Sequence, residues 1–306
     1  MSHITCISLQ TMQPVEAPQS CVLCLGNFDG VHAAHRALMY RAKKLRSDRF
    51  PDAACGVFCF DPPSSDYLTF NPEHLSDLQQ KLELFRMLGM EYAFLADFES
   101  LRHHTPEQFV QDILIDICHC AAAICGFNYR FGYKGAGTPE LLSTLLDTVE
   151  VQEEYRINNI IVSSTRIREL LREGRPEEAA MLLRRPYSIR ARVRHGKRLG
   201  RTWGFPTLNQ GFEQKMLVPK HGVYITEVLL PNGEYVRGIS NVGCHPTVDQ
   251  NAEVNCETHL LDYEGSLYGC EVTVFFLRFL RPEKKFNSAE ELQAQIAEDI
   301  RAANEY

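Results

Sequence analysis

The pattern of apolar and polar positions changes once along the chain, near residues 184–186. Before that point, short apolar runs such as CVLCL and CGVFCF alternate with longer stretches whose apolar residues recur at helical spacing. We expect strands within residues 21–28, 53–60, 90–98 and 121–126, and helices within 34–48, 75–89 and 105–120. Strands that alternate with helices form a parallel sheet with helices on both faces. Such sheets bind ligands beyond the carboxyl ends of their strands.

The second part of the chain has the pattern of short strands and turns. Strand-like runs cover residues 222–230, 234–243, 253–263 and 270–280, and Asn-Gly joins the first two, which is a strong hairpin signal. This spacing predicts a small antiparallel barrel or sandwich. Ser288 and Glu291 have the spacing of a capping box, so we expect a C-terminal helix that covers the barrel. The predicted domains are residues 1–184 and 185–306.

Composition narrows the class of protein. The chain has 306 residues, of which 44% are hydrophobic and 23% charged, as in soluble globular proteins. A net charge of -7 argues against a general nucleic-acid binder, and no apolar run is long enough to predict a membrane span. The 11 cysteines lie mostly in apolar runs. We interpret them as buried small side chains in a reducing cytoplasm rather than as disulfides or zinc ligands.

The segment GNFDGVHAAH, residues 26–35, follows the first predicted buried strand. Gly26 and Gly30 allow a tight turn into the next helix. His32 and His35 share one face near that helix N-terminus, where an anion is favoured by about 0.3–1 kcal/mol even at an exposed site. Two imidazoles there could hold a triphosphate, but two surface histidines could equally be a coincidence. The spacing alone favours neither interpretation.

A second segment, VSSTRIR at residues 162–168, raises the same question. Three hydroxyl side chains lead into a helical pattern that ends at Gly174. Hydroxyls at a helix start are most often caps. The two arginines that follow add guanidinium groups, so the segment also offers a set of phosphate donors.

Together these segments resemble the HxGH and ISSTxxR motifs of the nucleotidyltransferase superfamily. The whole chain resembles the bacterial bifunctional riboflavin kinase/FMN adenylyltransferases, also called FAD synthetases. Further supporting segments are FNYRFG (127–132), HGKRLGRTWGFPTLN (195–209), GVYITEV (222–228), ETHLLDYEGSLYG (257–269) and EKKFNSAEELQAQIAEDI (283–300). GFPTxN with the downstream ETHLLD is specific to the riboflavin kinase module. The resemblance implies a Rossmann-like nucleotidyltransferase domain over residues 1–184 and a riboflavin kinase barrel over 185–306.

By this resemblance, the first domain transfers AMP from ATP to FMN, which forms FAD and releases pyrophosphate. Such chemistry needs alignment and charge stabilisation more than covalent participation by the protein. His32 and His35 would act on the ATP phosphates, and Asn128 would bind the flavin. The positions implied for ATP binding in this domain are Gly26, Phe28, Asp29, Gly30, His32, His35, Ser164, Thr165 and Arg168.

The second domain would phosphorylate the 5′-hydroxyl of riboflavin with ATP and Mg²⁺ or another divalent cation. Thr207 and Asn209 would hold the metal, because oxygen donors suit a hard cation and residues two apart in a strand face the same side. Glu257 would be the general base, a role worth roughly 10²–10⁴ in rate. Without the resemblance, an exposed strand carboxylate would be the simpler interpretation of Glu257. The positions implied for ATP binding in the kinase are Gly196, Lys197, Gly200, Gly204, Pro206, Thr207 and Asn209.

Two departures from the family pattern lie in the first domain. The family's glycine before the second histidine is Ala34 here, and the family's FDPHP is FDPPSS, with Pro63 and Ser64 in place of histidine and proline. The second change removes an imidazole near the phosphates. We expect both activities, with riboflavin, FMN, FAD and ATP as ligands and neither nucleic acid nor membrane as a partner. The alternative is a riboflavin kinase whose adenylyltransferase domain is weakened.

Two other classes of protein compete with this interpretation. A nucleotidyltransferase with a different acceptor would share the histidine and SSTRIR segments, but it would not explain GFPTLN or ETHLLD. A flavin- or RNA-binding protein that had lost its chemistry would explain FDPPSS. The retained Thr207, Asn209 and Glu257 count against it.

Overall fold

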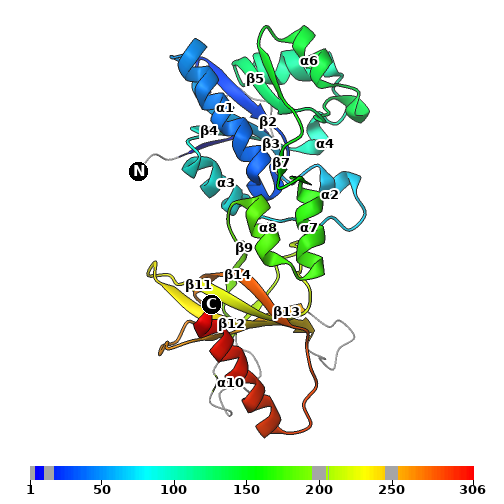
Figure 1. The fold of residues 1–306 in the computed structure, drawn as a ribbon. Coiled ribbons are helices and arrows are strands. Elements are labelled where there is room, and N and C mark those ends of the chain that lie inside the picture. The colour runs from blue at the N-terminus through cyan, green and yellow to red at the C-terminus, as the bar shows by residue number, and fades with distance from the viewer. Residues whose placement is uncertain (1–3, 10–16, 195–204, 206, 245–253) are drawn as a thin grey trace. The chain divides into compact units, whose positions relative to one another are not determined.

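The structure, a computed structural model, describes residues 4–9, 17–194, 205, 207–244 and 254–306. The chain divides into two compact units, Met1–Ser163 and Ser164–Tyr306. Each unit contains its own six-stranded sheet (Figure 1). The first sheet is parallel and the second is antiparallel, so the predicted change of architecture along the chain is confirmed.

The sheet of the first unit has the strand order β1-β4-β3-β2-β5-β6, with all pairs parallel. From β2 the chain moves outward through β3 to β4 and then returns to the other side of β2 with β5. The order therefore reverses between β2 and β5, and open α/β sheets bind their ligands at such a switch point. The strands are β1 (Thr5–Ser8), β2 (Cys21–Leu25), β3 (Ala54–Phe60), β4 (Tyr92–Ala96), β5 (Cys120–Gly126) and β6 (Val149–Gln152).

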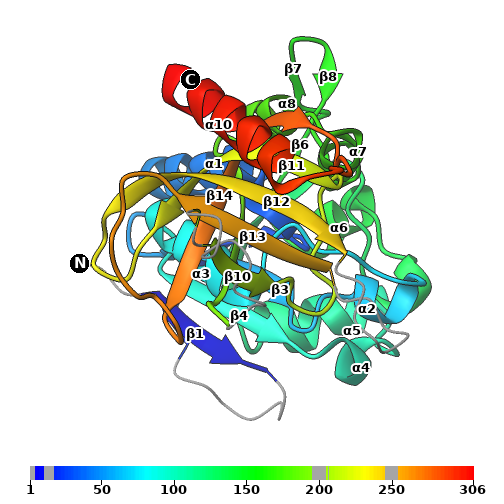
Figure 2. The ribbon, with the colours of Figure 1, turned by 90° about the horizontal axis from the view of Figure 1, so that it is seen from below.

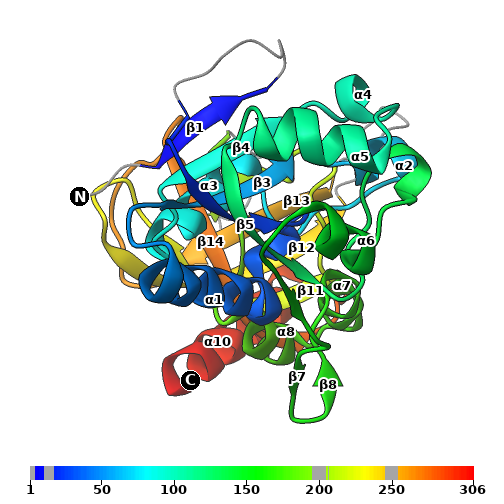
Figure 3. The same ribbon diagram turned by 90° about the horizontal axis from the view of Figure 1, so that it is seen from above.

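Helices cover both faces of this sheet, and Figure 3 shows α1 and α5 on opposite sides of it. One face is covered by α1 (Ala33–Arg49) and α3 (Leu78–Met87). The other is covered by α4 (Phe98–Leu101), α5 (Pro106–Gln108), the π-helix η2 (Phe109–Ile115) and α6 (Pro139–Leu145). The remaining elements of this unit are η1 (Asp29–Val31), α2 (Ser65–Leu68), η3 (Tyr133–Gly135), β7 (Arg156–Ile157) and β8 (Ile160–Ile161).

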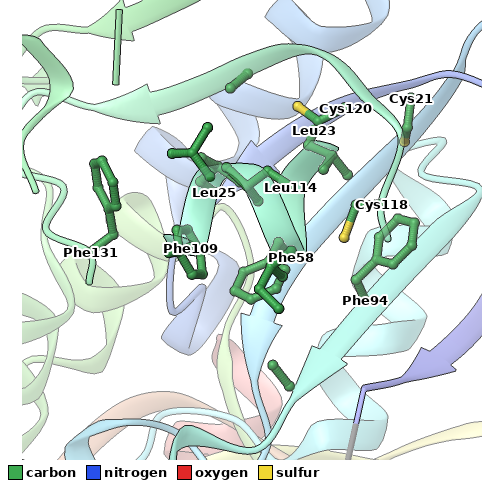
Figure 4. Close-up of a cluster of buried hydrophobic side chains, with 14 of the residues drawn as sticks. Cys21, Leu23, Leu25, Phe58, Phe94, Phe109, Leu114, Cys118, Cys120 and Phe131 are labelled. Atoms are coloured by element: carbon green, nitrogen blue, oxygen red, sulfur yellow. The ribbon is translucent and has the colours of Figure 1, made fainter. Parts of the chain in front are cut away.

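Strand β2 is buried on both faces, as the run CVLCL predicts. Cys21, Leu23 and Leu25 pack in the cluster that contains the η2 side chains (Figure 4), while Val22 and Cys24 pack under α1 and α3. Cys21 and Cys24 therefore point to opposite faces of the sheet. Burial raises the pKa of the Cys24 thiol well above its usual value, so this side chain remains a neutral apolar group.

The second unit contains an antiparallel sheet of strand order β10-β13-β12-β11-β14-β9. Its edge strands meet through a bridge between Arg194 and Asn209, and Gln210 Nε2 donates to the carbonyls of Ala191 (2.8 Å) and Val272 (3.1 Å). The sheet thus closes into the predicted barrel. Its strands are β9 (Tyr187–Arg192), β10 (Thr207–Gly211), β11 (Gly222–Leu229), β12 (Tyr235–Cys244), β13 (Val254–Leu260) and β14 (Glu271–Arg281).

The C-terminal helix α10 (Ala289–Glu305) packs against the outer side of the barrel (Figure 2). Ser288 Oγ accepts from the N–H of Glu291 at 3.2 Å, which confirms the predicted N-terminal cap. The guanidinium of Arg281 in β14 donates two hydrogen bonds to the buried carboxylate of Asp299, from Nη2 to Oδ2 at 2.7 Å and from Nε to Oδ1 at 3.0 Å. This bidentate pair fixes the helix on the barrel.

The helices α7 (Ser164–Glu173) and α8 (Pro176–Leu183) belong to the second unit. The N–H of Lys220, in the loop before β11, donates to the carbonyl of Leu171 at 3.0 Å, and α8 packs on β9 and β14. The compact unit therefore begins at Ser164, upstream of the predicted boundary after residue 184. Which activity each segment supports is a separate question, and the assignment of residues 1–184 and 185–306 stays a prediction.

Candidate active sites

The segment after β2 forms a strained turn at the switch point of the first sheet. Phe28 has a φ of 51°, Gly30 of 77° and Val31 of 40°. A positive φ is uncommon for a bulky residue and a true outlier for a β-branched one such as Val31. Such strain persists only where the surroundings enforce it, and it concentrates at functional sites.

Two hydrogen bonds from the segment before α3 hold this turn in place. Asp29 Oδ1 accepts from the N–H of Leu75 at 2.8 Å, and the N–H of Gly30 donates to Ser76 Oγ at 3.0 Å. The carboxylate of Asp29 is buried and shapes the turn. Its predicted part in ATP binding stays a prediction.

The ring of Phe28 supports the turn from below. It is fully buried and packs edge-on against Phe85 of α3, with ring centroids 5.5 Å apart, and against His35, with centroids 5.2 Å apart. A Cβ at Gly26 would lie 3.3 Å from the Phe28 ring, so glycine suits this close approach. Phe28 therefore positions the second histidine.

His32 and His35 lie face to face at the N-terminus of α1. Their ring centroids are 3.6 Å apart and their planes differ by 14°. His32 is the N-cap residue, and its Nδ1 accepts the N–H of His35 at 3.4 Å. An accepting ring nitrogen carries no proton, so neutral His32 carries its proton on Nε2. The N–H groups of Ala33 and Ala34 stand at the same open end of the helix, which favours an anion.

The environment of His35 keeps its ring neutral near neutral pH. Burial lowers the pKa of His35 well below 6.5, and the neighbouring His32 and Lys81 lower it further. Within the described residues, its buried Nδ1 has no hydrogen-bond partner. Such a ring can exchange hydrogen bonds with a ligand, but it brings no positive charge to the site.

Asn128 follows β5, the strand beside β2 across the switch point. Cys24 of β2 pairs with Ile124 of β5, so the two strands end near one another. The Asn128 side chain is exposed, and a Cβ at Gly126 would lie 3.3 Å from its Oδ1. The carboxyl ends of adjacent strands thus present the histidine turn and Asn128, as ligand binding at a switch point requires.

The altered FDPPSS segment is joined to the histidine turn by its new serine. Ser64 is buried, and its Oγ donates to Asn27 Oδ1 at 3.1 Å. Asn27 follows β2 and Ser64 follows β3, so the contact links two neighbouring strand ends. The imidazole expected at Pro63 has no replacement in this contact. Ala34 is half-buried in the first turn of α1.

The SSTRIR residues lie on α7, in the second unit. Ser164 is the first helical residue, and Arg168 lies one turn later on the same face. Thr165 is exposed, and Arg166 pairs with Glu169 at 2.9 Å, so Arg166 belongs to an ion pair of the helix surface. The predicted ATP-binding residues are therefore divided between two compact units.

In the barrel, Glu257 lies on β13, the middle strand of three adjacent strands, between β10 and β12. It stands opposite Asn209 of β10 on one side and opposite Asn241 of β12 on the other. Thr207 stands opposite His259 in the same pair of strands. Directly opposed residues share a face, so the structure brings Thr207, Asn209 and Glu257 together. The neighbours of Glu257 along β13 are fully buried, so Glu257 points away from the barrel interior.

Thr207, Asn209 and Glu257 form a row across the outer face of the barrel. Two residues that the sequence did not indicate, Asn241 and Glu283, extend this row. Asn241 Nδ2 donates to Glu283 Oε1 at 3.3 Å, and a Cβ at Gly243 would overlap the Glu283 carboxylate. Only the register of β12 against β13 places Asn241 beside Glu257, and no local pattern reveals that register. The five remaining residues of the predicted kinase ATP loop lie outside the described residues: Gly196, Lys197, Gly200, Gly204 and Pro206.

Within the described part of the chain, no helix is both long and apolar enough to cross a membrane.

Comparisons with known proteins match almost the whole chain. The FAD synthetase family model matches residues 15–166, and the riboflavin kinase family model matches residues 183–306. A bifunctional riboflavin kinase/FMN adenylyltransferase of Listeria monocytogenes is 34% identical over 285 residues, 91% of this chain and 90% of the relative. The Escherichia coli K12 protein of the same name is 33% identical over 300 residues, 95% and 94% of the two chains.

A solved structure matches over the full length. It is that of a Streptococcus pneumoniae protein described as a macrolide-efflux protein, with a TM-score of 0.89 and 27% identity over 99% of this chain and 100% of that one. Its fold matches that of this chain from end to end.

Proposed function

The chain belongs to the bifunctional riboflavin kinase/FMN adenylyltransferase family, and from this premise we propose which of its residues carry out each reaction. The enzyme phosphorylates riboflavin with ATP to give FMN, and it adenylylates FMN with a second ATP to give FAD and pyrophosphate. A kinase-only protein is not favoured, because both family models match. We assign adenylylation to residues 1–184 and phosphorylation to residues 185–306.

The stacked histidines at the N-terminus of α1 carry the adenylyltransferase assignment. A phosphate oxygen of FMN attacks the α-phosphorus of ATP, and the bond to the β-phosphate oxygen breaks as pyrophosphate leaves. His32 and the first N–H groups of α1 donate hydrogen bonds to phosphate oxygens on the leaving side, and His35 orders the His32 ring by stacking on it. Asn128 contributes an amide to the flavin, and Ser164, Thr165 and Arg168 add phosphate donors.

Glu257 carries the kinase assignment. Its carboxylate accepts the proton of the riboflavin 5′-hydroxyl as that oxygen attacks the γ-phosphorus of ATP and ADP leaves. Its register supports this role, because Glu257 lies on one face of the barrel with Asn209 and Asn241, beside the residues that we assign to the metal and ATP. Thr207 and Asn209 lie on β10, next to the strand that carries Glu257, and we place ATP on this side of Glu257.

Mg²⁺ fits the donor set of the kinase face. The hydroxyl of Thr207 and the amide oxygen of Asn209 are hard donors on one face of β10 and would hold the ion. When bound, the ion neutralises charge on the ATP phosphates. The buried free cysteines suit a reducing compartment, and we place the enzyme in the cytoplasm.

The decisive experiment is a coupled assay with products separated by chromatography. The purified chain is given riboflavin, ATP and Mg²⁺, and FMN should appear first and FAD second. A parallel reaction that starts from FMN tests adenylylation alone. If FMN accumulates and neither reaction yields FAD, the adenylyltransferase assignment is wrong and the chain is a riboflavin kinase.

A further inference from the structure

The row on the outer face of the barrel crosses three strands in a fixed order. The strands β10, β13 and β12 lie side by side (Figure 2), and they carry Asn209, Glu257 and Asn241 at one level. Neighbouring strands lie about 4.8 Å apart, so Asn241 stands one strand spacing from Glu257 on the side away from β10. By the proposed function, ATP lies on the β10 side and the reacting hydroxyl lies at Glu257. The carbon chain that carries this hydroxyl therefore extends toward Asn241.

A carboxylate beside Asn241 decides which way its amide points. Asn241 Nδ2 donates to Glu283 Oε1 at 3.3 Å. An ionised carboxylate only accepts hydrogen bonds, so the amide presents its NH₂ group to Glu283 and its carbonyl oxygen in another direction. An asparagine without such a neighbour can turn its amide over. Glu283 therefore leaves Asn241 Oδ1 as the amide atom that can accept a hydrogen bond from a ligand.

The surrounding backbone holds the Glu283 carboxylate at this place. A Cβ at Gly243 would overlap the carboxylate, which therefore lies against the bare backbone of β12. Glu283 follows Pro282, whose carbonyl accepts from Arg281 Nη1 at 3.3 Å. Arg281 is itself paired with Asp299 of α10. A carboxylate that only faced solvent would need neither the glycine nor the anchored strand end.

The groups on the β12 side of the row suit a ligand that carries several hydroxyl groups. The carboxylates of Glu257 and Glu283 and the carbonyl oxygen of Asn241 are all hydrogen-bond acceptors. A carbon chain with several O–H groups supplies the matching donors, and riboflavin carries such a chain between its ring and its 5′-hydroxyl. A site built to pair with a hydroxyl discriminates strongly against an analogue that lacks it.

We propose that Asn241 binds the hydroxyl-bearing chain of riboflavin and that Glu283 is a positioning residue, which holds the Asn241 amide in the orientation that accepts from this chain. The inference rests on the proposed kinase function, and it names the residues that select the acceptor. Neither residue takes the proton of the reacting hydroxyl, a role that stays with Glu257.

The test compares two flavins that share the reacting hydroxyl. One is riboflavin, and the other carries a 5-hydroxypentyl chain at the same ring nitrogen, so it lacks the other hydroxyls of the chain. We expect wild-type protein to phosphorylate riboflavin with a kcat/KM at least roughly tenfold above that for the analogue. Glu283→Ala should lower kcat/KM for riboflavin by roughly that factor, mainly through KM, and leave the analogue within about twofold. General damage to the barrel would instead lower the values for both flavins equally.

A double-mutant cycle tests whether Glu283 acts through Asn241. Asn241→Ala should reduce the preference for riboflavin by the same factor, and adding Glu283→Ala to it should cause no further loss. Glu234→Ala is the matched control, because Asn232 Nδ2 donates to Glu234 Oε2 at the same 3.3 Å in the turn between β11 and β12. This control should change neither flavin's kcat/KM. Conversion of supplied FMN to FAD should stay at the wild-type level in every variant.

The outcomes separate this inference from the proposed function. If wild-type protein phosphorylates neither flavin, the proposed kinase function fails. If it phosphorylates riboflavin without preference over the analogue, or if Glu283→Ala keeps the preference or slows both flavins equally, the inference is overturned. Losses that multiply in the double variant would show that Asn241 and Glu283 act independently, and they would also overturn it.

Discussion

Replacing Glu257 with glutamine should separate the two activities of the chain. Glutamine keeps the size of the side chain, and its amide can donate to or accept from the two opposed residues, Asn209 and Asn241. The position is half-buried on a paired strand, so we expect the free energy of unfolding to change by less than about 0.5 kcal/mol. By its proposed role as general base, Glu257→Gln would remove the group that accepts the proton of the riboflavin hydroxyl.

The size of the loss follows from that missing step. General-base catalysis contributes roughly 10²–10⁴ in rate, which corresponds to about 2.7–5.4 kcal/mol in the barrier. We therefore expect kcat for FMN formation to fall by that factor, while FAD formation from supplied FMN stays within twofold of wild type. Both rates are measured on the same preparation by chromatography of the flavins, so loss of protein would lower both together.

Glu227→Gln provides the matched control. Glu227 is also a half-buried strand carboxylate of the barrel, but it stands opposite Arg237 on β12, away from the row that contains Glu257. Its replacement should leave both rates unchanged. If Glu257→Gln keeps FMN formation within tenfold of wild type, or if it slows both reactions equally in folded protein, the general-base assignment is refuted.

Three further changes test other parts of the structure. Burial holds the pKa of His35 well below 6.5, so below that pH the unfolded chain binds a proton that the folded chain does not. The free energy of unfolding should therefore keep its full value above pH 6.5 and fall below it by up to about 1.4 kcal/mol per pH unit. His35→Gln should remove that slope, measured as the difference from wild type in hydrogen exchange of β2 amides at each pH. Asp299→Ala should destabilise the barrel by about 3 kcal/mol, measured by hydrogen exchange of β14 amides. This value is at the low end for a buried pair, because the Arg281 side chain is 20% exposed. Gly243→Ala should displace the Glu283 carboxylate and slow FMN formation at least tenfold with FAD formation from FMN unchanged; a wild-type rate would exclude Glu283 from the site.

The features that the sequence predicted correctly depend on local chemistry. The buried run CVLCL, the cap at Ser288 and the Asn-Gly hairpin between β11 and β12 are each decided within a few residues. The same holds for the alternation of strands and helices that predicted the parallel sheet. The short edge strand β1 and the π-helical turn of η2 were not predicted, because tertiary packing rather than local propensity selects them.

The candidate site residues also divide into those that local spacing reveals and those that only tertiary packing reveals. His32 and His35 could be paired from the sequence because helical spacing brings them together. Lys81 lies in a helix that the sequence predicted, but only the packing of α3 under the turn shows that its ammonium is buried beside His35. A lysine at helical spacing among polar residues would otherwise be interpreted as part of a solvated face.

The family models and the compact units divide the chain at different places. The FAD synthetase family model reaches residue 166 and so includes the start of SSTRIR, yet compactness assigns α7 to the unit that contains the kinase barrel. The N–H of Lys220 bonds to α7, and a Cβ at Gly174 would lie 2.8 Å from the Lys220 side chain, so the end of α7 is fitted to the barrel unit. A chain cut after Ser163 would lack the SSTRIR donors, and a chain cut after residue 184 would expose the apolar faces that α7 and α8 bury in the second unit. By the proposed assignment, adenylylation uses SSTRIR donors that belong to the same compact unit as the barrel, which would give a physical reason for both reactions to reside in one polypeptide.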